Sequence, residues 1–111
     1  QAGALAAEGA ARQAARVYVQ SANPEDAVAS AERTITFALA DYGVDPASAQ
    51  VDVACHPVAS DCLTRRGFVT VTIEIAVPLP LAPAALSISA PLSVPLRATA
   101  TQQVSRFWGA E

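Results

Sequence analysis

Apolar and polar positions alternate with two different periods along the chain, and the change of period falls near residue 50. Before it, apolar residues recur at the three- and four-residue spacing of one face of an α-helix. After it, the period shortens to two, as in a β-strand with one buried face. This order predicts an α+β domain over residues 1–111, in which two helices precede an antiparallel sheet.

The first predicted helix covers residues 1–22 and has an apolar face made almost wholly of alanine. Because alanine buries little area, we expect this helix to rely on close approach to another helix or backbone. Two interpretations stay open: a surface helix lying on the domain, or the lower part of a longer helix that continues upstream into a membrane. The stripe consists of Ala4, Ala7, Ala11, Ala14 and Tyr18, and the last four of these are candidate partner contacts.

The second predicted helix covers residues 24–42. Asn23 is a good N-cap, Pro24 suits the first helical position, and Gly43 permits a left-handed stop. Phe37 falls on the polar face of this helix, which makes it a candidate partner contact. The side chains predicted to face the core are Val28, Ala31, Ile35, Ala38, Leu39 and Tyr42.

A three-stranded antiparallel sheet is predicted between residues 50 and 106. Val51 and Val53 mark a short first strand, residues 68–77 alternate most clearly, and residues 93–106 repeat the pattern. Pro95 places the start of the last strand at a sheet edge. A sheet with one apolar face needs a cover, which the second helix is expected to supply.

Composition narrows the class of protein. The chain has 111 residues, 52% of them hydrophobic and 15% charged, with a net charge of −3. These values fit one globular domain and exclude a polybasic nucleic-acid binder. Residues 75–96 form a run of 22 uncharged residues, but the prolines within it prevent a transmembrane helix. We expect the natural chain to begin upstream of Gln1.

The two cysteines, Cys55 and Cys62, are expected to form a disulfide across a turn-rich loop in an oxidising compartment. A reactive thiol pair is the first alternative, although the spacing lacks the features that activate redox cysteines. The second is a metal site with His56, which offers three ligands where structural zinc needs four. We therefore expect neither a metal nor a cofactor.

Other chemistry-bearing residues are few. Glu74 and Arg97, with Asp52 on a neighbouring strand, form either an acid–base cluster or an ordinary cross-strand ion pair on a solvated face. Neither a glycine-rich phosphate loop nor a nucleophile elbow occurs in the sequence. We therefore expect no enzymatic activity. A hydrolytic or redox enzyme would need His56 beside a carboxylate or thiolate in a cleft.

Two further apolar features are candidate contacts. Leu79 and Leu81 lie in a proline-rich run that either folds over the core or forms a contact surface. Phe107 and Trp108 either plug the end of the sheet or form an exposed docking pair.

Taken together, these features resemble the extracytoplasmic domain of TadE-like pilus-assembly proteins of the Tad, Flp-type system. The resemblance lies in the alanine-rich helix, the Cys55–Cys62 hairpin, and the segments 69–73, 77–81 and 96–101. It implies a protein similar to minor pilins or pseudopilins, in which one N-terminal membrane helix carries a small domain outside the membrane. The membrane segment and the prepilin-peptidase site of that family are absent here, and we expect both upstream of Gln1.

The resemblance implies a non-enzymatic, single-pass membrane component of a pilus or related secretion machinery. Its expected partners are other pilus or secretion-system proteins, or further copies of itself. The alternative is an extracytoplasmic binding module of the cell envelope that holds a peptide or lipid against the proline-rich segment. An apolar cavity at that segment favours the binding module, whereas a solid core with exposed aromatic or alanine faces favours assembly.

Overall fold

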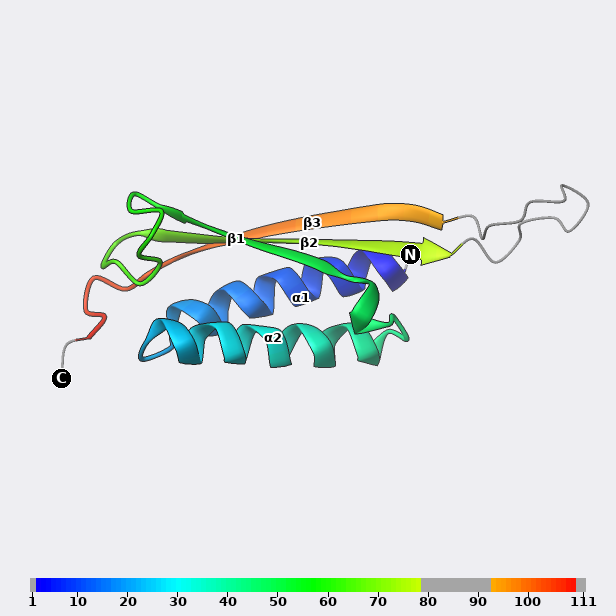
Figure 1. The fold of residues 1–111 in the computed structure, drawn as a ribbon, viewed down its shortest axis with the longest axis horizontal. Helices are drawn as coiled ribbons and strands as arrows, with labels where there is room; N and C mark the ends of the chain where they lie inside the picture. Colours follow the sequence, from blue (N-terminus) through cyan, green and yellow to red (C-terminus); the bar gives the residue numbers. More distant parts are fainter. Residues whose placement is uncertain (1, 79–92, 110–111) are drawn as a thin grey trace, which may run out of the picture.

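The computed structural model describes residues 2–78 and 93–109, in which two helices cover one face of a three-stranded antiparallel sheet (Figure 1). The strands lie side by side in the order β1-β2-β3. The α+β arrangement predicted from the sequence is confirmed. The elements in chain order are α1 (Ala2–Val19), α2 (Pro24–Asp41), the 3₁₀ helix η1 (Pro46–Ser48), β1 (Gln50–His56), β2 (Phe68–Pro78) and β3 (Ser93–Gln103).

The cover of the sheet, expected from the second helix alone, is supplied chiefly by α1, which contacts α2, β2 and β3 and is the central element of the packing. Its small residues let the helix backbone approach the sheet: a Cβ on Gly3 would lie 2.7 Å from Cγ2 of Val77 and 3.1 Å from Cδ1 of Leu96. The buried face is broader than predicted, with side chains at most 5% exposed. It consists of Ala6, Ala7, Ala10, Ala11, Ala14, Ala15 and Tyr18.

This burial corrects the expectation that the alanine stripe is a contact surface for partners. Ala7, Ala11, Ala14 and Tyr18 are core residues, enclosed by the chain's own helix and strands. Alanine contributes little apolar area per residue, but it permits a shorter distance between a helix and its neighbours. Close approach therefore gives this helix a fully packed face without bulky side chains.

Helix α2 begins and ends at the signals seen in the sequence. The Asn23 side chain caps the helix by accepting a hydrogen bond from the backbone N–H of Asp26 at 2.9 Å. Gly43 follows the C-terminus with a φ of +73°, a left-handed conformation that favours glycine. The side chains that α2 buries are Ala27, Ala31, Ile35 and Leu39.

Two of the side chains predicted to face the core from α2 are exposed instead. Val28 is 45% exposed and Tyr42 is 49% exposed, so for these two the prediction was wrong. The buried arc is centred on the line from Ala27 to Ile35, where α2 packs beside α1. The flank of α2 that carries Val28 extends past this contact.

The sheet buries its central strand most deeply. The core-facing side chains of β2, Val69, Val71, Ile73 and Ile75, are at most 1% exposed. On β1, Val51 pairs with Ile73 and Val53 with Val71, yet Val51 is 47% exposed and Val53 37% exposed. The core therefore lies beneath β2 and β3, and it covers β1 only in part.

Candidate interaction surface

The loop between β1 and β2 is closed by the disulfide predicted from the sequence. Cys55 is bonded to Cys62 with their Cα atoms 5.0 Å apart. Within the loop, the Thr64 hydroxyl donates a hydrogen bond of 2.8 Å to the carbonyl oxygen of Asp61. Because both sulfurs are in the disulfide, neither is available as a thiolate nucleophile or as a metal ligand.

The single histidine lies on the solvent side of this hairpin. His56 is exposed at the end of β1 and pairs in register with Phe68. In the described ranges 2–78 and 93–109, no group of three or more histidine, cysteine or acidic side chains is placed to hold a metal ion. The structure thus puts His56 on an open strand end, not inside a cleft.

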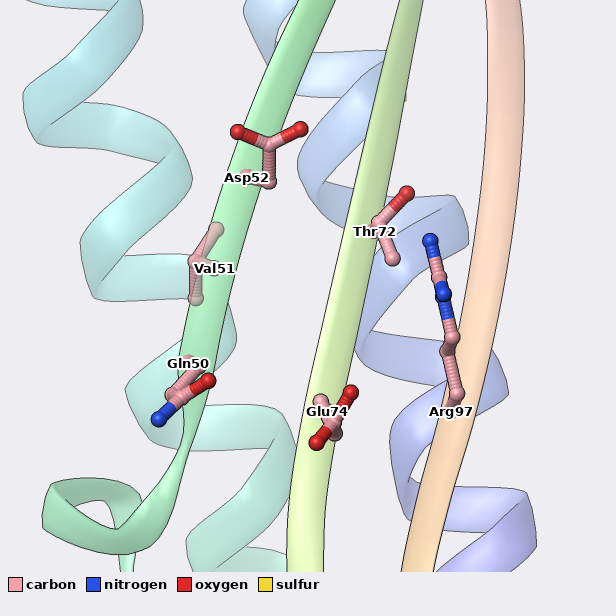
Figure 2. Close-up of a pocket in the computed structure, with 6 residues that line it drawn as sticks. All are labelled: Gln50, Val51, Asp52, Thr72, Glu74 and Arg97. Carbon is pink, nitrogen blue, oxygen red and sulfur yellow. The ribbon is translucent and has the colours of Figure 1, made fainter.

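The charged residues singled out on the strands line a shallow depression on the solvent face of the sheet (Figure 2). Glu74 pairs in register with Arg97, and Asp52 pairs with Thr72. Figure 2 shows the Arg97 side chain running along β3 toward the level of Thr72. The charged side chains are exposed, and attraction between opposite charges is weak in that setting.

A ladder of threonine hydroxyls continues the same face between β2 and β3. The hydroxyls of Thr70 and Thr101 are 2.8 Å apart, and those of Thr72 and Thr99 are 3.3 Å apart. These pairs satisfy one another across the strands, which stabilises the sheet. The face is therefore polar, flat and internally hydrogen-bonded.

A second depression lies between α2 and β1. It is lined by Glu32, Ile35 and Thr36 of α2, by Pro46 and Ala49 of the connection, and by Val51 of β1. We call this depression, together with the exposed Val53 and the free edge of β1, the β1 groove. The β1 groove was not anticipated from the sequence, because the Val51–Val53 alternation is typical of any half-buried strand.

Phe37 lies on the outer side of α2, next to this region. It is 71% exposed, as its place on the polar helix face indicates, and it lines a hollow with Ala29, Arg33 and two residues of the β1 groove, Glu32 and Thr36. A role for Phe37 as a partner contact stays a prediction.

The two aromatic residues near the C-terminus, Phe107 and Trp108, differ in burial. Trp108 is partly buried, and its Nε1–H donates a hydrogen bond of 2.8 Å to the carbonyl oxygen of Ser21, between the helices. Its own carbonyl oxygen accepts a hydrogen bond of 2.6 Å from Nε of Arg65. Phe107 is 63% exposed, with the Arg106 guanidinium 4.7 Å from its ring centre. Trp108 is the plug, and Phe107 is the exposed member.

Two of the sequence-predicted contacts, Leu79 and Leu81, lie outside the described residues. In the described part of the chain, no helix is both long and apolar enough to cross a membrane. Neither a protein-family model, nor a curated protein sequence, nor a solved structure matches this chain. Its function is therefore inferred from its own residues and their arrangement.

Proposed function

We propose that this chain is the extracytoplasmic structural domain of a TadE-like pilus-assembly or secretion-assembly protein, which acts by contacting other proteins and not by catalysis. In this proposal a membrane helix precedes Gln1 and anchors the domain. The observation that carries the proposal is the position of α1. Its first turn lies at one end of the sheet, where Gly3 packs against Val77 and Leu96 (Figure 1).

In this proposal the anchor continues α1 upstream from the end of the sheet at which Gly3 packs against Val77 and Leu96. Because α1 packs against α2, β2 and β3, its anchor would set the orientation of the whole domain. The close alanine contacts make this coupling stiff, since there is little side-chain volume to rearrange between the helix and the sheet.

The Cys55–Cys62 disulfide supports a position outside the cytoplasm. Such bonds form and persist in oxidising compartments, and thiols are kept reduced in most cytosols. Phe37 and Phe107, at 71% and 63% exposed, are the most exposed aromatic side chains of the described residues, and their rings are available for contacts on the outer surface.

The proposal is tested with the full-length natural protein in its own host. We expect it to sediment with membranes, to resist carbonate extraction and to be released by detergent. In intact cells, a protease added from outside should remove this domain, and thiol labelling without reductant should leave Cys55 and Cys62 unmodified.

Loss of the gene should abolish surface pili or the associated secretion, and the wild-type gene should restore them. The deletion strain is also complemented with a gene that carries Phe37→Ala. This variant is informative because, in the proposal, the exposed ring contacts partner proteins, whereas it contributes little to the core. Recovery of the protein in the cytosol with free thiols, or normal piliation in the deletion strain, would refute the proposal.

A further inference from the structure

The helical layer of this domain is wider than the sheet it covers. Two helices side by side span about 20 Å, because each helix with its side chains is about 10 Å across. Three strands spaced about 4.8 Å apart span only about 14 Å. The helical layer therefore has room for about one more strand.

The part of the helical layer that the described strands leave uncovered lies beside the edge of β1 that does not pair with β2. Helix α1 lies beneath β2 and β3, which it contacts, and Figure 2 shows α2 behind the sheet and extending beyond β1 on the side away from β2. A strand laid along β1 would continue the sheet over this overhanging flank of α2.

Exposed apolar side chains lie in the same region, along β1 and the flank of α2 that extends beyond it. On β1, Val51 is 47% and Val53 is 37% exposed, whereas Ile73 and Val71, their register partners on β2, are fully buried. On the overhanging flank of α2, Val28 is 45% exposed and lies one turn before Glu32 of the β1 groove. These side chains face the core side of the sheet but lack the neighbour that would cover them.

The backbone of β1 offers a matching set of hydrogen-bonding groups. In the described part of the chain β1 pairs with β2 alone, so alternate N–H and C=O groups of its seven residues point outward. Natural edge strands are commonly protected by lysine, proline or an inward-pointing charge. The β1 sequence contains neither lysine nor proline, and its one charged side chain, Asp52, points to the outer face, whereas β3 at the opposite edge contains Pro95.

We propose that an extended segment of a different protein chain adds to β1 as a fourth strand and covers the β1 groove. Its alternate side chains are apolar and pack against Val51, Val53 and the flank of α2. Main-chain pairing provides affinity in such complexes, and the alternate side chains provide specificity. This proposal is independent of the pilus role proposed above.

The charge of the region indicates that the added strand is basic. Residues 24–56, which include α2 and β1, hold six acidic residues and one arginine, whereas the rest of the chain holds four acidic residues and six arginines. Glu32 lines the β1 groove, and Asp52 points to the outer face of β1. Arginine or lysine on the outward positions of the added strand would lie on the same face as Asp52 and would complement its carboxylate.

A second copy of this domain does not fit the same place by edge-to-edge pairing. The second copy would bring its own helices to the strip that α2 already occupies, and packed helices need about 8–10 Å between their axes. The partner is therefore a strand without a helix beneath it, such as a terminal or linker segment.

The test uses a soluble peptide of about nine residues in which valine alternates with threonine and arginine. It is titrated into the isotope-labelled domain and followed by amide chemical shifts and hydrogen exchange. We expect shifts in β1 and in the Glu32–Thr36 turn of α2, with new protection of the outward amides of β1. A peptide N-methylated on the amides that face β1 should not bind, because it cannot form the ladder.

Val53→Lys places a charge on the core side of the free edge and should weaken binding at least about tenfold. Val94→Lys is the matched control, because Val94 is a valine on the other edge strand with nearly the same exposure, 39% against 37%. Urea unfolding of both variants checks that each is folded. The N-methylated peptide tests the same point on the unaltered protein.

Three results would overturn the proposal. One is the absence of binding at about 1 mM peptide, the range of very weak complexes. Another is binding at the wrong place or by the wrong contacts. It would be seen as an affinity that N-methylation of the peptide or Val53→Lys leaves unchanged, or as amide shifts in β3 or on the outer face of the sheet. The third is self-association of the domain that Val53→Lys abolishes, which would make a second copy the occupant.

Discussion

Gly67 lies at the start of β2, where the disulfide loop meets the last strand. A Cβ at this position would lie 2.6 Å from the carbonyl oxygen of His56 and 2.9 Å from that of Thr64. Both obstacles are backbone atoms, and the backbone around them is held in place. The N–H of Gly67 donates to the carbonyl of Thr64 at 2.9 Å, and the carbonyl of Gly67 accepts from the N–H of Val104 at 2.7 Å.

Gly67→Ala should therefore destabilise the fold. Forcing an extra methyl group into a packed site costs about 1–3 kcal/mol, whereas the lower entropy of the unfolded chain returns about 0.4–1 kcal/mol. The expected net loss in the free energy of unfolding is about 1–2 kcal/mol. For a domain of this size that corresponds to a fall in Tm of roughly 4–8 °C.

Gly9→Ala is the matched control, because it adds the same methyl group within α1. No atom would lie within 4 Å of the new Cβ, and alanine is favoured over glycine in a helix by about 1 kcal/mol. Urea unfolding with the disulfide intact should show Gly67→Ala less stable and Gly9→Ala as stable as the parent or more so. If Gly67→Ala unfolds at the parent's urea midpoint, the close contact deduced for this glycine is wrong.

The remaining predictions concern the disulfide, the C-terminal plug and one buried tyrosine. Replacing Cys55 and Cys62 by serine should cost about 2.5 kcal/mol of unfolding free energy, from the entropy of the short loop that the bond closes; an unchanged urea midpoint would contradict this. Trp108→Phe removes the hydrogen bond to the Ser21 carbonyl and should cost about 1 kcal/mol by the same assay, and a variant as stable as the parent would mean that this bond contributes nothing. Burial raises the pKa of Tyr18 above its ordinary value of 10.0, so the unfolded chain ionises first as the pH rises through that value. Stability measured by urea unfolding should therefore fall above about pH 10 and fall less in Tyr18→Phe; equal declines would contradict the assignment.

Local signals in the sequence were enough to predict the elements themselves. The cap at Asn23 and the stop at Gly43 predicted a helix over residues 24–42, and the structure has α2 at Pro24–Asp41. The strict alternation over residues 68–77 predicted a strand that the structure has at Phe68–Pro78. These signals act through neighbouring residues, so they do not depend on how the elements pack.

The exposures that define the β1 groove were not predictable in this way. Val28 and Val51 occupy apolar positions of a helix and a strand, and either would be buried if a further strand covered it. They are exposed because, in the described ranges 2–78 and 93–109, two helices cover a sheet of three strands, which is a relation between elements distant in sequence. Periodicity within one segment carries no information about the width of the layer opposite.

For this protein, local signals in the sequence were enough to place the helices, the strands and the disulfide of the first hairpin, but not to say how much of each apolar face is buried. The burial of the alanine face of α1 depends on the tertiary structure, because alanine allows a close approach whose distance is set by the surface that the helix meets. The tertiary structure also leaves β1, among the described residues, with one edge unpaired beside α2. Both outcomes follow from the distances between packed layers, which no single segment encodes.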